Sequence, residues 1–163
     1  MFRKMRRFGQ QMTEEESVRV LQRATSGVLA LEGDDGYPYA VPLSFVYHDG
    51  RLIFHCAVSG HKLDAIARNE KASFCVIDGD EVVPERYTTA YRSVIAFGRM
   101  RRLEGEEKLH AIELLTARYV PGNEARNHQE IEGAYDRLCM LELRIEHMTG
   151  KEGRELLQRK SQQ

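Results

Sequence analysis

The sequence lacks an excess of charge of either sign and any long apolar run. Its 163 residues include 24 lysines and arginines against 25 aspartates and glutamates, so the formal net charge is −1. Such a balance produces no overall field that attracts nucleic acid or an anionic membrane surface. No apolar stretch approaches the roughly 18 residues of a membrane-spanning helix. The basic start at residues 3–7 is followed by glutamates rather than by an apolar segment, so we interpret it as a solvated tail and not as a signal peptide.

Cysteine is scarce and unpaired in the sequence. Cys56, Cys75 and Cys139 are odd in number, far apart and free of any Cys-x-x-Cys motif. This pattern predicts neither a disulfide framework nor a structural zinc site, and it favours a reducing compartment. We therefore expect a cytoplasmic protein in which Cys56 acts as a small buried hydrophobe. His55 and Cys56 would lie on opposite faces of a strand, so we expect no metal site there.

Several motifs of familiar enzymes are also missing. The sequence contains no Gly-x-Gly-x-x-Gly fingerprint, which excludes a Rossmann-type seat for a dinucleotide. Ser44 has no Gly-x-Ser-x-Gly elbow around it, and Gly150-Lys151 lacks the spacing and the hydroxyl residue of a phosphate loop. Hydrolase and nucleotide triphosphatase functions are therefore disfavoured.

The length and the hydrophobic patterning predict one mainly β domain. Thr13 and Glu16 form a capping box at the start of a helix. The stretch 39–47 alternates as a strand and Asp49-Gly50 then predicts a tight hairpin turn, whereas Pro42 inside the strand indicates an edge, a bulge or an opening. Further strands are expected at 28–31, 51–57, 72–77, 91–100 and 139–146, and helices at 61–68 and 106–119, with a turn at 78–80 and a short helix within 123–135.

These elements predict an α+β fold with flanking helices around a six-stranded antiparallel barrel. We expect residues 1–12 to form a flexible tail, residues 13–151 to form the domain and residues 152–163 to form a loose polar tail. One domain of this size is expected to carry one site.

The segment Ser59-Gly60-His61-Lys62 is the most informative for chemistry. It joins a strand to a helix, where glycine permits close approach and the helix start offers unpaired N–H groups. A lysine adds a positive charge, and a histidine adds a hydrogen-bond donor. The segment therefore predicts a phosphate site, although a capped surface helix with solvated side chains would have the same sequence.

Several motifs in order resemble one known family. These are Tyr39-Ala40-Val41-Pro42-Leu43-Ser44-Phe45-Val46-Tyr47, Leu52-Ile53-Phe54-His55-Cys56-Ala57, Gly60-His61-Lys62-Leu63-Asp64, residues 91–98 and Thr149-Gly150-Lys151-Glu152. Over residues 12–151 the sequence resembles the flavin-binding split-barrel proteins related to pyridoxamine 5'-phosphate oxidase, and more narrowly their nitroimidazole-resistance branch.

The resemblance implies an FMN site between the two chains of a homodimer. It implies that the backbone from Pro42 to Phe45 faces the isoalloxazine ring and that His61 and Lys62 hold the phosphate. The full set of implied cofactor-binding residues is Pro42, Leu43, Ser44, Phe45, His55, Cys56, Ala57, Gly60, His61, Lys62 and Ser93, with no catalytic residue assigned. Because His61 stands where the oxidases proper have an arginine, and their C-terminal substrate motif is absent, oxidation of pyridoxamine phosphate is not expected.

The expected function follows from the cofactor, because a bound flavin would carry out the redox chemistry itself. A reduced nicotinamide would reduce FMN, which would pass electrons to a nitroaromatic or quinone acceptor. Three alternatives stay open: a deazaflavin-binding split barrel, a non-catalytic flavin-binding stress protein, and a haem-binding split barrel. The candidate haem ligands are His55, His61, His110, His128 and His147.

Overall fold

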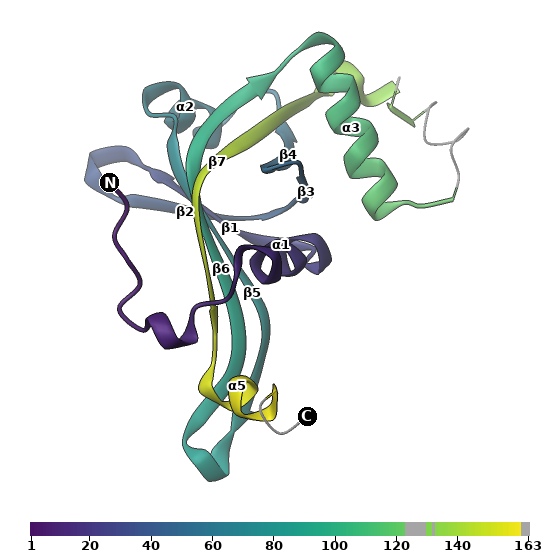
Figure 1. The fold of residues 1–163 in the computed structure, drawn as a ribbon. Helices are drawn as coiled ribbons and strands as arrows, with labels where there is room; N and C mark the ends of the chain where they lie inside the picture. The colour runs from purple at the N-terminus through teal and green to yellow at the C-terminus, as the bar shows by residue number, and fades with distance from the viewer. Residues whose placement is uncertain (123–129, 132, 161–163) are drawn as a thin grey trace.

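The structure is a computed structural model that describes residues 1–122, 130–131 and 133–160. Its centre is a seven-stranded sheet in the order β2-β1-β5-β6-β7-β4-β3, with every pairing antiparallel (Figure 1). The strands are β1 (Ser26–Glu32), β2 (Pro38–Ser44), β3 (Val46–His48), β4 (Arg51–Ala57), β5 (Lys71–Val83), β6 (Thr88–Leu103) and β7 (Leu138–Glu152), and the helices are α1 (Glu14–Arg23), α2 (His61–Arg68), α3 (Gly105–Tyr119) and α5 (Arg154–Lys160).

The sheet closes on itself at one residue. The two outermost strands, β2 and β3, are consecutive in the chain and are separated by Phe45 alone. The edges of the sheet therefore meet through the chain and not through a hydrogen-bonded ladder, which makes the molecule a split barrel. Inside it, the Phe45 and Phe54 rings pack on Phe74 with centroids 5.0 and 5.1 Å apart.

The expected number of strands is corrected from six to seven because the stretch 39–47 does not form one strand. It breaks at Phe45, whose backbone N–H and C=O both hydrogen bond the Tyr119 hydroxyl instead of a neighbouring strand. Pro42 lies in β2, an edge strand, as its missing N–H predicts. The Asp49-Gly50 hairpin turn is also confirmed, with φ angles of 47° and 73°.

The turn expected at residues 78–80 is wrong. The ladder between β5 and β6 continues past this point, with a register shift between Asp78 and Asp80. Gly79 adopts a φ of +70°, which accommodates the extra residue as a bulge. The chain reverses instead at Pro84–Arg86, so β5 and β6 form the long arm at the bottom of Figure 1.

The N-terminal capping box is present, with Thr13 and Glu16 each bonding the other's backbone N–H. At the other end, β7 runs to Glu152 and is followed by helix α5, where a loose tail was expected. An ion pair of 2.6 Å between Arg86 and Glu155 joins α5 to the arm. Most of the 123–135 segment lies outside the described residues. None of the described helices is long and apolar enough to span a membrane.

Strands β4 and β7 are covered on both faces. Phe54 and Leu141 point into the barrel, whereas Ile53 and Met140 point outward and pack with α3 residues such as Ile112. Figure 1 shows α3 lying beside β3 and β4, apart from α2. The outer face of β4 is thereby close to the apolar face of α3.

Candidate functional site

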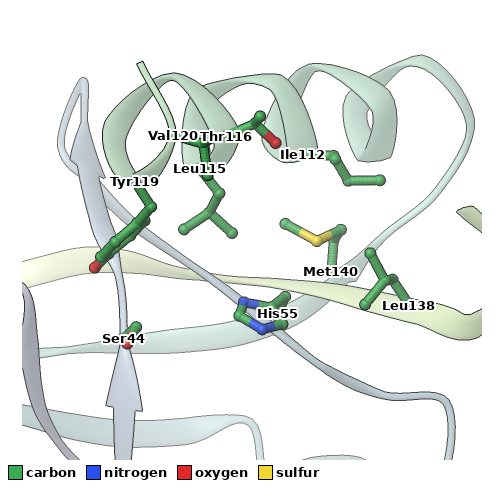
Figure 2. A pocket seen from close by; sticks show the side chains of 9 residues that line it. All are labelled: Ser44, His55, Ile112, Leu115, Thr116, Tyr119, Val120, Leu138 and Met140. Carbon is green, nitrogen blue, oxygen red and sulfur yellow. The ribbon is translucent and has the colours of Figure 1, made fainter. Parts of the chain in front are cut away.

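One pocket of about 320 Å³ lies between α3 and the outer face of β4 and β7 (Figure 2). Two of the predicted site residues, Ser44 and His55, line it together. His55 is directly opposite Met140 in the β4–β7 ladder. The lining residues are Ser44, His55, Ile112, Leu115, Thr116, Tyr119, Val120, Leu138 and Met140. Apolar walls with a few polar groups are typical of small-molecule sites.

Tyr119 closes one end of this pocket and fixes its shape. Its hydroxyl accepts a hydrogen bond from the Phe45 N–H at 3.1 Å and lies 2.7 Å from the Phe45 carbonyl and 2.5 Å from the Thr25 carbonyl. The single hydroxyl proton can be donated to only one of the two carbonyls at a time. The backbone of Phe45 is therefore already bonded within the chain, and its side chain is fully buried.

A second group of predicted residues meets at the start of α2. Gly60 precedes the helix with a φ of +132°, a conformation that side chains rarely allow, and no side chain caps the helix. The Gly60 carbonyl accepts from the amides of Leu63 and Asp64. The amides of His61 and Lys62 have no partner within the described part of the chain. These two N–H groups lie at the positive end of the helix dipole, an arrangement in which a helix start can hold an anion, and we call the group the anion cradle.

The side chains at this cradle differ in their availability. The His61 imidazole stacks on Tyr39 at 4.1 Å and lies 3.2 Å from the Asp34 carboxylate, which also binds Arg68 at 2.6 Å. Lys62 is half-buried and has no ion pair with any described carboxylate. Lys62 is therefore the free cation of the cradle, whereas His61 is held by its neighbours.

Cys56 connects β4 to the same region. Burial raises the pKa of its thiol to about 11, and the neighbouring Cys139 adds to this effect, while Lys62 and Arg102 oppose it. Lys62 therefore lies close enough to Cys56 to act on its charge. Cys56 faces the barrel interior, as its packing with the inner core shows.

The remaining predicted residues are spread over several surfaces. Leu43 packs against the inner core, whereas Pro42 and Ala57 are exposed. Ser93 is half-buried in β6, opposite Ile77 and Lys151, and does not line the α3 pocket. The structure thus brings Ser44 together with His55, and Cys56 together with the Gly60–Lys62 cradle, but it leaves Ser93 apart.

The α3 wall of the pocket was not predicted. Leu115 and Tyr119 are four residues apart on the helix, a spacing that indicates one shared face, but the sequence does not show which strand that face covers. The contact of the Asp34 carboxylate with the His61 imidazole was also missed, because it joins a turn to a helix far along the chain. Among the described residues, no three His, Cys, Asp or Glu side chains gather as a metal site requires.

The fold and the site together define a class: an antiparallel split barrel with an anion cradle at one helix start and an apolar pocket under another helix. The family model described as pyridoxamine 5'-phosphate oxidase matches residues 13–152. The chain therefore belongs to the pyridoxamine 5'-phosphate oxidase family. None of the curated proteins matches it.

Solved structures with the same fold include proteins with different names. A conserved hypothetical protein from Mycobacterium tuberculosis aligns with a TM-score of 0.79 at 20% identity, covering 94% of this chain and 92% of that one. A candidate 5-nitroimidazole antibiotic resistance protein from Bacteroides thetaiotaomicron aligns with a TM-score of 0.73 at 21% identity, covering 86% of this chain and 85% of that one. An FAD and haem binding protein from Mycobacterium smegmatis aligns with a TM-score of 0.75 at 24% identity, covering 89% of this chain and 74% of that one. At these identities the likeness shows the fold.

Proposed function

We propose that this protein binds FMN and passes electrons from a reduced nicotinamide, through the flavin, to a small acceptor such as a nitroaromatic or a quinone. The observation that carries the proposal is the cradle at α2. Two unpartnered amides and the free cation of Lys62 match the charge and the acceptor oxygens of a phosphate monoester. Membership of the pyridoxamine 5'-phosphate oxidase family supports a flavin as the molecule that carries this phosphate.

The isoalloxazine ring is proposed to lie along β2. As an edge strand, β2 has a row of backbone groups that no other strand pairs. Pro42 has no N–H and the Phe45 backbone is bonded to Tyr119, which leaves the neighbours Leu43 and Ser44 at this edge. Backbone groups of successive residues in an antiparallel strand alternate between the paired strand and the free edge, so one of these two residues offers its N–H and C=O to the ring. His55, which shares the α3 pocket with Ser44, would border the ring on one side.

When bound, the flavin supplies the hydride and electron transfer, and the chain supplies orientation and shielding. The cradle fixes the phosphate end, and the edge of β2 fixes the ring end. Leu115 and Met140 provide an apolar wall that excludes water from the neighbouring pocket. A pocket of about 320 Å³ fits a small aromatic acceptor, and the fold shared with the candidate nitroimidazole resistance protein favours a nitroaromatic one.

We further infer that two chains associate as a homodimer. One outer face of β1, β5 and β6 carries four partly exposed apolar residues. These are Val28, Ile77, Ile95 and Phe97, with exposed fractions of 40, 65, 38 and 37%, respectively. An apolar sheet face of this kind supports the inference, because exposed apolar patches are often sites of association. Ser93 lies on the same face, next to Ile77 in the ladder, which is consistent with Ser93 reaching a flavin held by the partner chain.

The first test is the absorption spectrum of the purified protein after addition of FMN and removal of the excess. We expect flavin absorption bands whose intensity corresponds to about one bound FMN per chain. The variant Lys62→Ala should raise the Kd for FMN by about tenfold or more, because it removes a charge-assisted hydrogen bond. Lys71→Ala, at an exposed lysine at the start of β5, is the matched control and should leave the Kd unchanged.

The outcomes separate the parts of the proposal. A spectrum without flavin bands would overturn the cofactor assignment. Bound FMN with an unchanged Kd in Lys62→Ala would place the phosphate elsewhere. If FMN binds but a reduced nicotinamide is not oxidised in the presence of nitroaromatic and quinone acceptors, the proposed oxidoreductase activity is wrong and the protein is a flavin-binding protein only.

Haem is a second candidate cofactor because one histidine faces an apolar pocket. His55 lies among Leu115, Leu138 and Met140, and a related fold is that of an FAD and haem binding protein. A Soret band after titration with haemin, lost in His55→Ala, would support this candidate. Flavin bands without a Soret band would exclude it.

A further inference from the structure

Two of the three cysteines face each other in the fold although they are far apart in the sequence. Cys56 in β4 is directly opposite Cys139 in β7, and Cys139 contributes to the raised pKa of the Cys56 thiol. Both side chains are on the inner side of the sheet, where Cys139 is fully buried and Cys56 is half-buried. The distance of these two cysteines in the sequence gave no sign of this arrangement, and Cys75 is on another strand, β5.

The position of the pair suits a covalent bond. Residues directly opposite on antiparallel strands have Cα atoms about 4.5–5.5 Å apart. A disulfide needs Cα atoms about 4.4–6.8 Å apart with both Cβ atoms on the same side. The β4–β7 register supplies both conditions, so the two sulfurs can be joined without a change of strand pairing.

We propose that Cys56 and Cys139 form an oxidation site at which a peroxide closes a reversible cross-strand disulfide. Cys56 is the more exposed thiol, so its thiolate attacks one oxygen of hydrogen peroxide. The O–O bond breaks, and the hydroxide that leaves takes up a proton to become water. The Cys139 thiol then gives up its proton and attacks the sulfur of the Cys56 sulfenic acid, which releases a second water. Two thiols are oxidised by two electrons and one peroxide is reduced to two waters.

The surroundings of Cys56 set the rate of this reaction. Burial raises the pKa of Cys56 to about 11, so little thiolate is present at neutral pH. As long as the pH is below that pKa, each increase of one pH unit should raise the thiolate fraction, and with it the oxidation rate, about tenfold. Lys62 and Arg102 favour the thiolate, so the cradle and the oxidation site influence each other. Because Cys56 is four residues before Gly60, the disulfide would fix the strand end that leads into the cradle.

The test uses Cys75→Ser protein without added cofactor, so that only the two opposed thiols remain. After treatment with hydrogen peroxide, thiol titration should show the loss of both thiols. Proteolysis without reductant, followed by mass spectrometry, should find peptides of Cys56 and Cys139 joined within one chain and lacking two hydrogens. Dithiothreitol should restore both thiols, and oxidation should be faster at about pH 9 than at neutral pH.

Matched variants keep the test decisive. Cys56→Ser and Cys139→Ser, each made in the Cys75→Ser protein, should yield no intrachain link. Folding of these variants is not required, because the peptide map of the parent protein already identifies the bond. The proposal is overturned if both thiols stay reduced at alkaline pH, if Cys56 is found as sulfinic or sulfonic acid beside a free Cys139, or if the link joins two chains.

Discussion

Glu142 is a negative charge at a position where only 2% of the side chain is exposed. It is held between Arg51 at 3.2 Å and Arg101 at 2.7 Å, so one carboxylate joins β4, β6 and β7. Both arginines keep contact with solvent, and Arg101 also binds Glu107 on α3. A buried carboxylate of this kind contributes by satisfying its partners more than by attraction alone.

Glu142→Gln should therefore lower the free energy of unfolding by about 2 kcal/mol, because it leaves two arginines around a neutral amide. Glu146→Gln is the matched control on the same strand. Glu146 is 40% exposed and paired with Arg99, and its loss should cost less than about 1 kcal/mol. Urea unfolding of both variants measures the difference. Equal effects would mean that burial does not distinguish the two glutamates.

At the scale of single residues, features formed by neighbours in the sequence were predictable, and contacts between distant residues were not. Gly60 and Lys62 are neighbours in the sequence, and the helix start that they form follows from local rules. The bond between Tyr119 and Phe45 spans 74 residues, and neither residue signals the other. Cys56 and Cys139 likewise meet only through the β4–β7 register.

Tyrosine hydroxyls hold both ends of helix α3. Tyr119 bonds the break between β2 and β3, and Tyr135 donates to the Gly105 carbonyl at the helix start at 3.2 Å. The first contact is part-buried and the second is exposed, so the C-terminal end of the helix carries the stronger attachment. That end also closes the pocket.

Tyr119→Phe should lower the free energy of unfolding by about 1–2 kcal/mol, because the part-buried Phe45 N–H loses its acceptor. Tyr135→Phe removes an equivalent hydroxyl at the exposed end, and it should cost only a few tenths of a kcal/mol. Urea unfolding of the two variants provides the comparison. If Tyr135→Phe is the more destabilising, the anchor of α3 is at its start.

Elements with strong local signals were predicted well, and those decided by pairing were not. The capping box of α1 and the Asp49-Gly50 turn are confirmed because their residues adopt those conformations on their own. Gly79 was interpreted as a turn, but the long ladder of β5 with β6 favours a bulge. Helix α5 was missed because its attachment depends on Arg86, which is on the arm.

At the scale of the whole molecule, the proposed dimer depends on the outer face of β1, β5 and β6. Ile95→Glu would place a charge in the middle of that apolar face and should convert the dimer to a monomer. Sedimentation equilibrium of the wild type and the variant measures the change.

Leu109→Glu is the matched control for this substitution. Leu109 is on α3, away from the face, and its exposure of 38% equals that of Ile95. This variant should sediment as the wild type does. A monomeric wild type, or a dimer that persists in Ile95→Glu, would contradict the proposed association.

The strand order has a further consequence for how a ligand enters. The central strands β6 and β7, with 16 and 15 residues, have neighbours on both sides, whereas the edge strands β2 and β3 have 7 and 3 residues and one neighbour each. Local opening requires the least free energy at such edges. The edge strand β2, which is proposed to touch the ring, should therefore open locally more often than the central strands β5, β6 and β7. In the proposed flavin complex, the ring would enter by opening of the β2 edge, while the bonds of Tyr119 keep the break at Phe45 in place and the domain stays folded.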